Sequence, residues 1–288
     1  MRTVQIICMS LLIMFFLQSC DSIPFTEEKL PSFEEIGRRH NSAVSEAFYI
    51  LNKQYRKTIK NDQNIFHIKQ IEETVWKTLT IHQTPGLPHS LKQFRESLQT
   101  LKSYLYDHIT SGEAISKNDS MLIYEMSIDM LYTAGILSDR QFHFIQEINA
   151  VVWADSLTAV TTIRRIEEQA YAELKAEAHV VLIYSAVLRH SLSYWKHEGR
   201  RWLNMLSSTI GKARVMGDID WEQVAKEDAA GAVVGAIAGA IAGAKAAAGA
   251  SLMFGPGGGV MLFSASLIKG IVAGAAAASL HAAIVSAL

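Results

Sequence analysis

The chain has 288 residues, of which 49% are hydrophobic, 27 are lysine or arginine and 28 are aspartate or glutamate. Its formal net charge of −1, with no basic stretch, argues against a nucleic-acid-binding protein. Cys8 and Cys20 are the only cysteines, so packing rather than a disulfide framework must hold the fold.

The first twenty residues have the pattern of an export signal. Met1-Arg2-Thr3 gives a positive start, and the apolar run that follows is too short and wrongly flanked for a membrane-spanning helix. Leu17-Gln18-Ser19-Cys20 then resembles a bacterial lipoprotein lipobox, which implies cleavage before Cys20 and lipidation of its thiol. We expect a signal peptide over 1–19, a lipidated tether over 20–30, and export to a bacterial membrane. The outer membrane, on its periplasmic or surface side, is the expected anchor site.

Residues 31–227 predict a helical body. Ser32 and Glu35 form a capping-box pattern, followed by apolar residues at helical spacing from Phe33 to Tyr55. Further helices are predicted over 65–79, from Ser90 onward, and from Asn118 or Asp119 to a stop at Gly135.

A stretch with no proline and only one glycine runs from the capping box Ser138–Gln141 to about Met205. It predicts either one very long helix or two helices that break near Asp155-Ser156. Val180 to Tyr184 is β-prone but lies among helix-forming residues, so we interpret it as a buried helix face. Since no strand alternation occurs, the fold class is all-α.

No catalytic or metal-binding motif emerges from this body. Helical glutamates and histidines can build a metal site in a bundle, but the Glu-x-x-His spacing is absent around His179 and His190. Four glutamates are instead predicted to form a solvated face, paired in part with Arg164 and Lys175. They are Glu167, Glu168, Glu173 and Glu177. We therefore expect no enzyme activity, no metal and no cofactor.

Aromatic residues gather just before the C-terminal tail, which we define as residues 228–288. They are Tyr194, Trp195, Trp202 and Trp221. Tryptophan and tyrosine prefer membrane interfaces, which predicts interface anchors beside an apolar hairpin. The alternative is that they close the core of the bundle.

The composition of the C-terminal tail differs from that of the body. From Ala229 onward it holds 21 alanines and 11 of the chain's 18 glycines, and its only charged residues are Lys245 and Lys269. Four of its glycines recur every four residues, which places them on one face of a helix and allows a second backbone to approach closely. They are Gly231, Gly235, Gly239 and Gly243. At the start of this helix, Asp228 is predicted to be the N-cap.

Two apolar arms make up this tail, over about 229–254 and 260–288, and each is long enough to cross ~30 Å of hydrocarbon. The break between them cannot continue a helix, so it predicts a hairpin turn. It consists of Gly255, Pro256, Gly257, Gly258 and Gly259. Because the first arm is only weakly apolar, we expect it to insert conditionally. The alternative is a tightly packed hairpin inside a soluble fold.

Two sequence patterns together resemble uncharacterised secreted proteins of Bacteroidetes-type bacteria. One is a Ser-x-x-Tyr-Trp-like segment and the other an Asp-x-x-Gly-Ala-x-x-Gly segment. The matching residues are Ser191, Tyr194, Trp195, Asp228, Gly231, Ala232 and Gly235. The tail is also similar to glycine-zipper segments of class II bacteriocins and of some envelope proteins. These resemblances imply membrane association and helix–helix packing.

The sequence thus predicts a helical bundle followed by a glycine-zipper hairpin. We expect a lipid-anchored envelope protein whose hairpin inserts in or packs against a membrane. Its expected partners are membrane lipids and either a second copy of the chain or a partner helix, bound through the glycine face. An alternative function is a bacteriocin-like effector that oligomerises and permeabilises a target bilayer.

Overall fold

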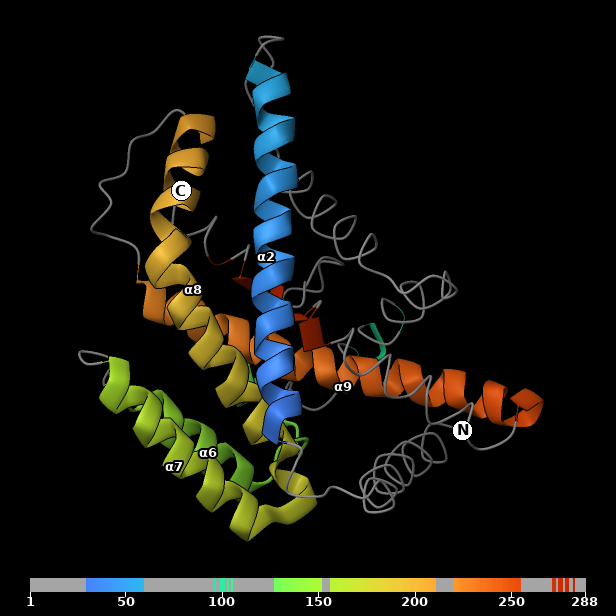
Figure 1. Ribbon diagram of the computed structural model, residues 1–288. Coiled ribbons are helices and arrows are strands. Elements are labelled where there is room, and N and C mark those ends of the chain that lie inside the picture. The colour runs from blue at the N-terminus through green and yellow to red at the C-terminus, as the bar shows by residue number, and fades with distance from the viewer. Residues whose placement is uncertain are drawn as a thin grey trace.

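The computed structural model describes the chain over the helices and turns of 30–59, 127–151, 156–210 and 220–254. It also describes single helical positions between 96 and 105 and between 271 and 282. Every regular element among these residues is a helix, which confirms the all-α class (Figure 1). Cys20, the turn 255–259 and the predicted helix over 65–79 lie outside the described residues.

The first described helix, α2, spans Leu30–Ile59 and buries one apolar stripe. Val44, Ala47 and Leu51 recur three or four residues apart on that stripe, as an amphipathic helix requires. The predicted capping box at Ser32 is wrong, because α2 begins at Leu30 and places Ser32 inside the helix. Glu35 bonds Arg38 and Arg39 within the same helix instead.

Two short helices follow. α5, Ile128–Thr133, is capped by Ser127, whereas the predicted caps, Asn118 and Asp119, lie outside the described residues. The chain then turns at Gly135, as predicted, and the φ of +69° at this position favours glycine. α6, Asp139–Asn149, begins with the capping box of Ser138 and Gln141, so that prediction is confirmed.

The long stretch from Ser138 to about Met205 divides twice, so it forms three helices rather than the predicted one or two. α7, Ser156–Leu174, begins where a break was predicted, but a second break follows at the 3₁₀ turn η4, Lys175–Ala178. Lys175 has φ +54°, although Lys-Ala-Glu-Ala is made of good helix formers, so tertiary packing overrides local propensity here. α8, His179–Ile210, then leaves at a corner with α7 (Figure 1). Val181 to Tyr184 form a buried helical face in α8, as predicted.

The last long helix, α9, spans Trp221–Phe254 and runs without interruption across residue 228. Asp220 caps it, since its Oδ1 accepts hydrogen bonds from the backbone N–H groups of Glu222 and Gln223, each at 3.0 Å. The predicted N-cap role of Asp228 is therefore wrong, because Asp228 lies two turns inside the helix.

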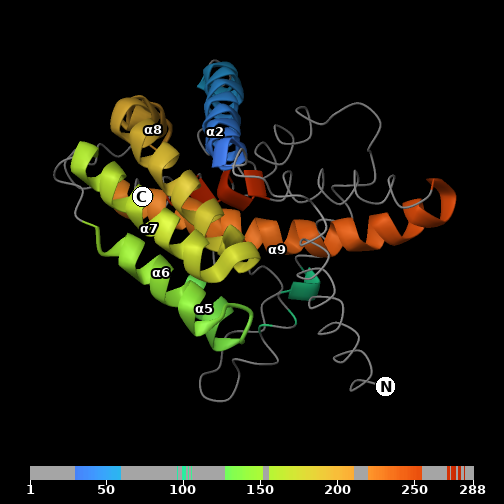
Figure 2. The ribbon, with the colours of Figure 1, turned by 60° about the horizontal axis from the view of Figure 1, so that its bottom comes forward.

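The core lies where α8 packs against both α2 and α9 (Figure 2). α9 crosses α8 and α2 steeply, and α6 and α7 form a further layer on α8 (Figures 1 and 2). Gly199 allows α8 to approach α9, since a Cβ at this position would lie 2.8 Å from the ring of Trp221. Over the residues that the structure describes, no helix combines the length and apolar character needed to cross a membrane.

Candidate functional site

Two parts of the tail approach each other to backbone distance. A Cβ added to Gly231 of α9 would lie 2.5 Å from the carbonyl oxygen of Gly274, and one added to Gly274 would lie 2.8 Å from Cα of Gly235. Only glycine fits both positions, because real Cβ atoms essentially never approach so closely. Gly239 is also buried, while the surroundings of Gly243 lie outside the described residues. Thus Gly231 and Gly235 receive another helical segment of the same chain.

Asp228 lies one turn before this crossing and is fully buried. The Ser191 hydroxyl donates to its Oδ2, and Nε1 of Trp195 donates to the same oxygen at 2.9 Å. Oδ1 has no hydrogen-bond partner in the described structure. The two segments that carry the sequence resemblance therefore meet in space, through Ser191 and Trp195 on α8 and Asp228 on α9.

Two more buried side chains complete what we call the Asp228 junction: His40, Ser191, Trp195, Asp228 and Ser279. Nε2 of His40, on α2, lies 3.0 Å from the Ser279 hydroxyl and 3.7 Å from Asp228 Oδ2. Both His40 and Ser279 are fully buried. The junction thus joins α2, α8, α9 and the segment around 279.

Burial dominates the electrostatics of this junction. Desolvation raises the pKa of Asp228 to about 7, although the Ser191 hydroxyl, the nearby Ser279 hydroxyl and the Trp195 indole oppose that rise. Desolvation likewise lowers the pKa of His40 to about 4, although its hydrogen bond to Asn41 opposes that shift. Near neutral pH the dry site therefore favours uncharged forms of both groups.

The residue types of the Asp228 junction are those of a hydrolase triad, but the arrangement is not. In a triad the carboxylate orients Nδ1 of the histidine while the serine faces Nε2. Here Asp228 and Ser279 both face Nε2 of His40, and Nδ1 faces Asn41. All three side chains are inaccessible to solvent. This geometry suits the joining of helices better than the activation of a nucleophile.

The aromatic residues surround the junction. Trp195 stacks on Trp221 with ring centroids 5.2 Å apart, and the Trp202 indole donates to the Tyr194 hydroxyl at 2.9 Å. Tyr194, Trp195 and Trp202 are buried and Trp221 is partly buried. Their positions fit the alternative that they close the core, and an interface role stays a prediction.

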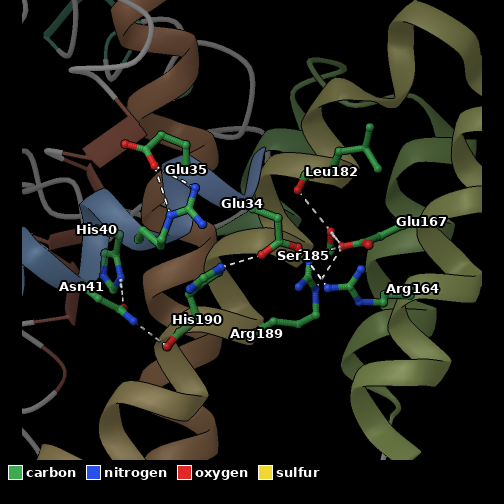
Figure 3. Close-up of polar contacts among 11 residues, drawn as sticks. Glu34, Glu35, His40, Asn41, Arg164, Glu167, Leu182, Ser185, Arg189 and His190 are labelled. Carbon is green, nitrogen blue, oxygen red and sulfur yellow. Dashed lines mark hydrogen bonds and ion pairs between the residues drawn. The ribbon is translucent and has the colours of Figure 1, made fainter. Parts of the chain in front are cut away.

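A second polar cluster lies nearer the N-terminus of α8, and we call it the Arg189 junction: Glu34, Glu167, Ser185, Arg189 and His190 (Figure 3). Arg189 pairs with Glu34 at 2.7 Å and with Glu167 at 3.0 Å. Ser185 also donates to Glu167. The prediction that Glu167 belongs to a solvated face is wrong, because its side chain is only 8% exposed.

Glu34 connects α2 to this cluster. Burial alone would raise the pKa of Glu34, but hydrogen bonds and charge from Arg189 and His190 outweigh it and lower the pKa to about 2. A pocket of about 370 Å³ opens beside the cluster, between α2, α7 and α8. Phe33 and Leu182 give its wall an apolar part, while Arg164 contacts Glu34 at 3.5 Å. Since these charged groups already pair with one another, the pocket does not by itself indicate a ligand.

The other three glutamates of the predicted solvated face, Glu168, Glu173 and Glu177, are exposed as predicted. Glu173 pairs with Arg140 of α6 rather than with Arg164 or Lys175. Within the described ranges, no group of three histidine, cysteine, aspartate or glutamate side chains is placed to hold a metal ion.

Sequence reasoning missed most of the polar residues that join the helices. His40 falls among the apolar positions of α2, four residues before Val44, and a polar residue in that position was the available signal. Arg189 and Ser279 gave no comparable signal, because their partners lie far away in the sequence.

No protein-family model matches the chain, and no curated protein or solved structure matches it. The function is therefore inferred from the site itself.

Proposed function

We propose that this chain is a non-enzymatic, lipid-anchored envelope protein. Its glycine-rich C-terminal hairpin mediates helix–helix association and inserts in, or packs against, a membrane. The lipobox ending at Cys20 and the length of the tail's arms support the membrane location. The resemblance to glycine-zipper segments supports the association.

One observation carries this proposal: the contact of Gly231 with Gly274. This contact brings two helical segments of the chain to backbone distance. It supports the proposal because small-residue faces make contacts of the same kind between helices in membranes. Each interior glycine costs a helix about 1 kcal/mol relative to alanine, so close packing has to offset that cost.

The first arm of the tail can insert in a membrane only if α9 first leaves its place in the fold. Val233, Val234 and Ala236 of α9 are buried in the body of the protein. For the first arm to insert in a bilayer, α9 must leave α8 and exchange these contacts for lipid. The docked form of α9 is thus the resting form of the proposed membrane element, and insertion is conditional.

Carbonate extraction of membranes tests this proposal with the full chain and Cys20→Ala. Truncation before α9 is unsuitable, because it would remove Asp228 and much of the core. If Cys20→Ala that also lacks residues 1–19 stays in the carbonate-resistant pellet, the tail is an independent membrane element, because neither the lipid nor the apolar signal run can then hold the protein there. Cys8→Ala, which leaves the lipobox intact, is the matched control and should fractionate like the wild type.

Full solubility of Cys20→Ala would contradict the role of the hairpin in the membrane and leave the lipid as the anchor. Dye release from liposomes distinguishes the effector alternative. An envelope protein of the proposed kind leaves the vesicles sealed, whereas rapid release at low protein-to-lipid ratio would identify a permeabilising effector.

A further inference from the structure

Two ionisable groups from distant parts of the chain meet in the dry core. Asp228 Oδ2 of α9 and His40 Nε2 of α2 lie 3.7 Å apart, and both side chains have no exposed surface. This distance exceeds that of a hydrogen bond. The location of their protons follows from the neighbouring contacts.

Asn41 fixes the tautomer of His40. Its Nδ2 donates to the backbone carbonyl of His190 at 2.9 Å, so its Oδ1 faces Nδ1 of His40 at 3.0 Å (Figure 3). Because an amide oxygen only accepts, Nδ1 must carry a hydrogen. In a neutral imidazole, Nε2 is then the acceptor.

The Ser279 hydroxyl donates the hydrogen bond that this acceptor needs, and its oxygen lies 3.0 Å from Nε2. The Ser279 hydroxyl has one hydrogen, so when it donates to His40 it does not donate to Asp228. The Asp228 carboxyl then accepts hydrogen bonds from Ser191 and Trp195 only, and both bind Oδ2. Oδ1 is buried without a partner among the described residues. An ionised carboxylate is costly in such a site, whereas a neutral carboxyl carries no charge.

We propose that Asp228 and His40 hold a single proton in the folded core, and that this proton lies on Asp228. α9 then docks against α2 through a neutral pair. In the unfolded chain at mildly acidic pH, the proton lies on the imidazole instead, so folding moves it from His40 to Asp228. This inference goes beyond the proposed function and holds whether or not the tail reaches a membrane.

The surrounding ionisable groups agree with a neutral pair. On α9, the charge of the neighbouring Glu227 raises the pKa of Asp228 and so disfavours its ionised form. On α8, the charge of His190 lowers the pKa of His40 and so disfavours its protonated form. His190 is itself bound to Glu34 at 2.7 Å. Burial raises the pKa of Asp228 and lowers that of His40, so the two effects on stability oppose each other between about pH 4 and 6.5.

The stability of the wild type conceals two pH dependences that oppose each other, and single variants should reveal each of them separately. His40→Gln leaves Asp228, whose raised pKa stabilises the fold in acid, so the unfolding constant should rise roughly 100-fold from pH 5 to pH 8. Asp228→Asn leaves His40, whose lowered pKa has the opposite sign. Its unfolding constant should rise roughly 30-fold from pH 8 to pH 5.

Spectroscopy of the full wild-type chain in detergent locates the proton, and two variants assign the carboxyl band. At about pH 6, ¹⁵N shifts of His40 should show a neutral ring protonated at Nδ1. Infrared spectra should contain the band of a protonated buried carboxyl group. This band should disappear in Asp228→Asn and persist in Asp220→Asn, which changes the exposed cap of the same helix.

Two outcomes would overturn the inference. A doubly protonated His40 ring without the carboxyl band would identify an ion pair. A neutral ring without that band would mean that the core holds a bare carboxylate. Neither result bears on carbonate extraction of the tail, so failure here is distinguishable from failure of the proposed function.

Discussion

α8 is joined to its neighbours by two junctions that use the same spacing and opposite chemistry. Ser191 and Trp195, four residues apart, donate to the single carboxyl of Asp228. Ser185 and Arg189, also four residues apart, meet Glu167. The first junction lies in a fully buried site beside the glycine contact, and the second reaches a partly exposed glutamate, Glu34.

The difference shows how burial decides whether the side chains that join two helices are charged or neutral. Around Asp228 no arginine or lysine is found to bond the carboxyl among the described residues, so the site is stable when the carboxyl is neutral. Around Arg189 the charges are retained, because two carboxylates and a hydroxyl surround the guanidinium and its partners. The Arg189 junction should therefore be sensitive to loss of one partner, and the Asp228 junction to steric change and protonation.

Removal of Arg189 should have the largest effect. Arg189→Met leaves Glu167 buried without its cation, and breaking such a pair costs about 3–5 kcal/mol of unfolding free energy. Urea denaturation measures this change. Adding Glu167→Gln to Arg189→Met should restore a large part of the loss, because the unpaired charge is then gone.

The exposed pair of Arg140 and Glu173 supplies the control for that experiment. Arg140→Met should cost less than about 1 kcal/mol, since exposed ion pairs contribute little. Equal losses for Arg140→Met and Arg189→Met would contradict the distinction between a buried and an exposed charged contact.

Gly231→Leu should have the next largest effect. A side chain there meets the carbonyl group of Gly274, and overpacking of this kind costs roughly 1–3 kcal/mol. The variant should lower the thermal unfolding midpoint and, in the Cys20→Ala background, increase the carbonate-resistant fraction by releasing α9. Gln223→Leu places the same side chain on an exposed position of the same helix and should leave both measurements nearly unchanged.

The fold could be predicted from the sequence to the extent that it depends on local signals. Ser138 with Gln141, the stop at Gly135, and the buried run from Val181 to Tyr184 all follow from capping, turn and periodicity rules. The break at Lys175 does not, because Lys-Ala-Glu-Ala is made of good helix formers and contains no local stop signal.

The junctions lay beyond local signals for the same reason. The four-residue spacing of the glycines predicted a close helix contact, but not that Gly274 would fill it. Glu167 lies in a run of charged residues typical of a solvated face, and its burial depends on Arg189, which is 22 residues further along the chain. Asp228 was expected to cap a helix because the composition changes there, whereas the helix begins at Trp221.

The smallest expected effect concerns acid stability and Glu34. Its pKa is lowered in the folded state, so its contribution is present above the unfolded value near 4.5 and is lost as pH falls toward about 2. Glu34→Gln should therefore flatten the fall of the unfolding midpoint across that window, while it lowers stability at neutral pH. Glu168→Gln, an exposed carboxylate beside the same pocket, should keep the wild-type acid profile. An unchanged acid profile in Glu34→Gln would show that the ionised form of Glu34 does not stabilise the contact of α2 with α8, and that the charges of the Arg189 junction act between α7 and α8.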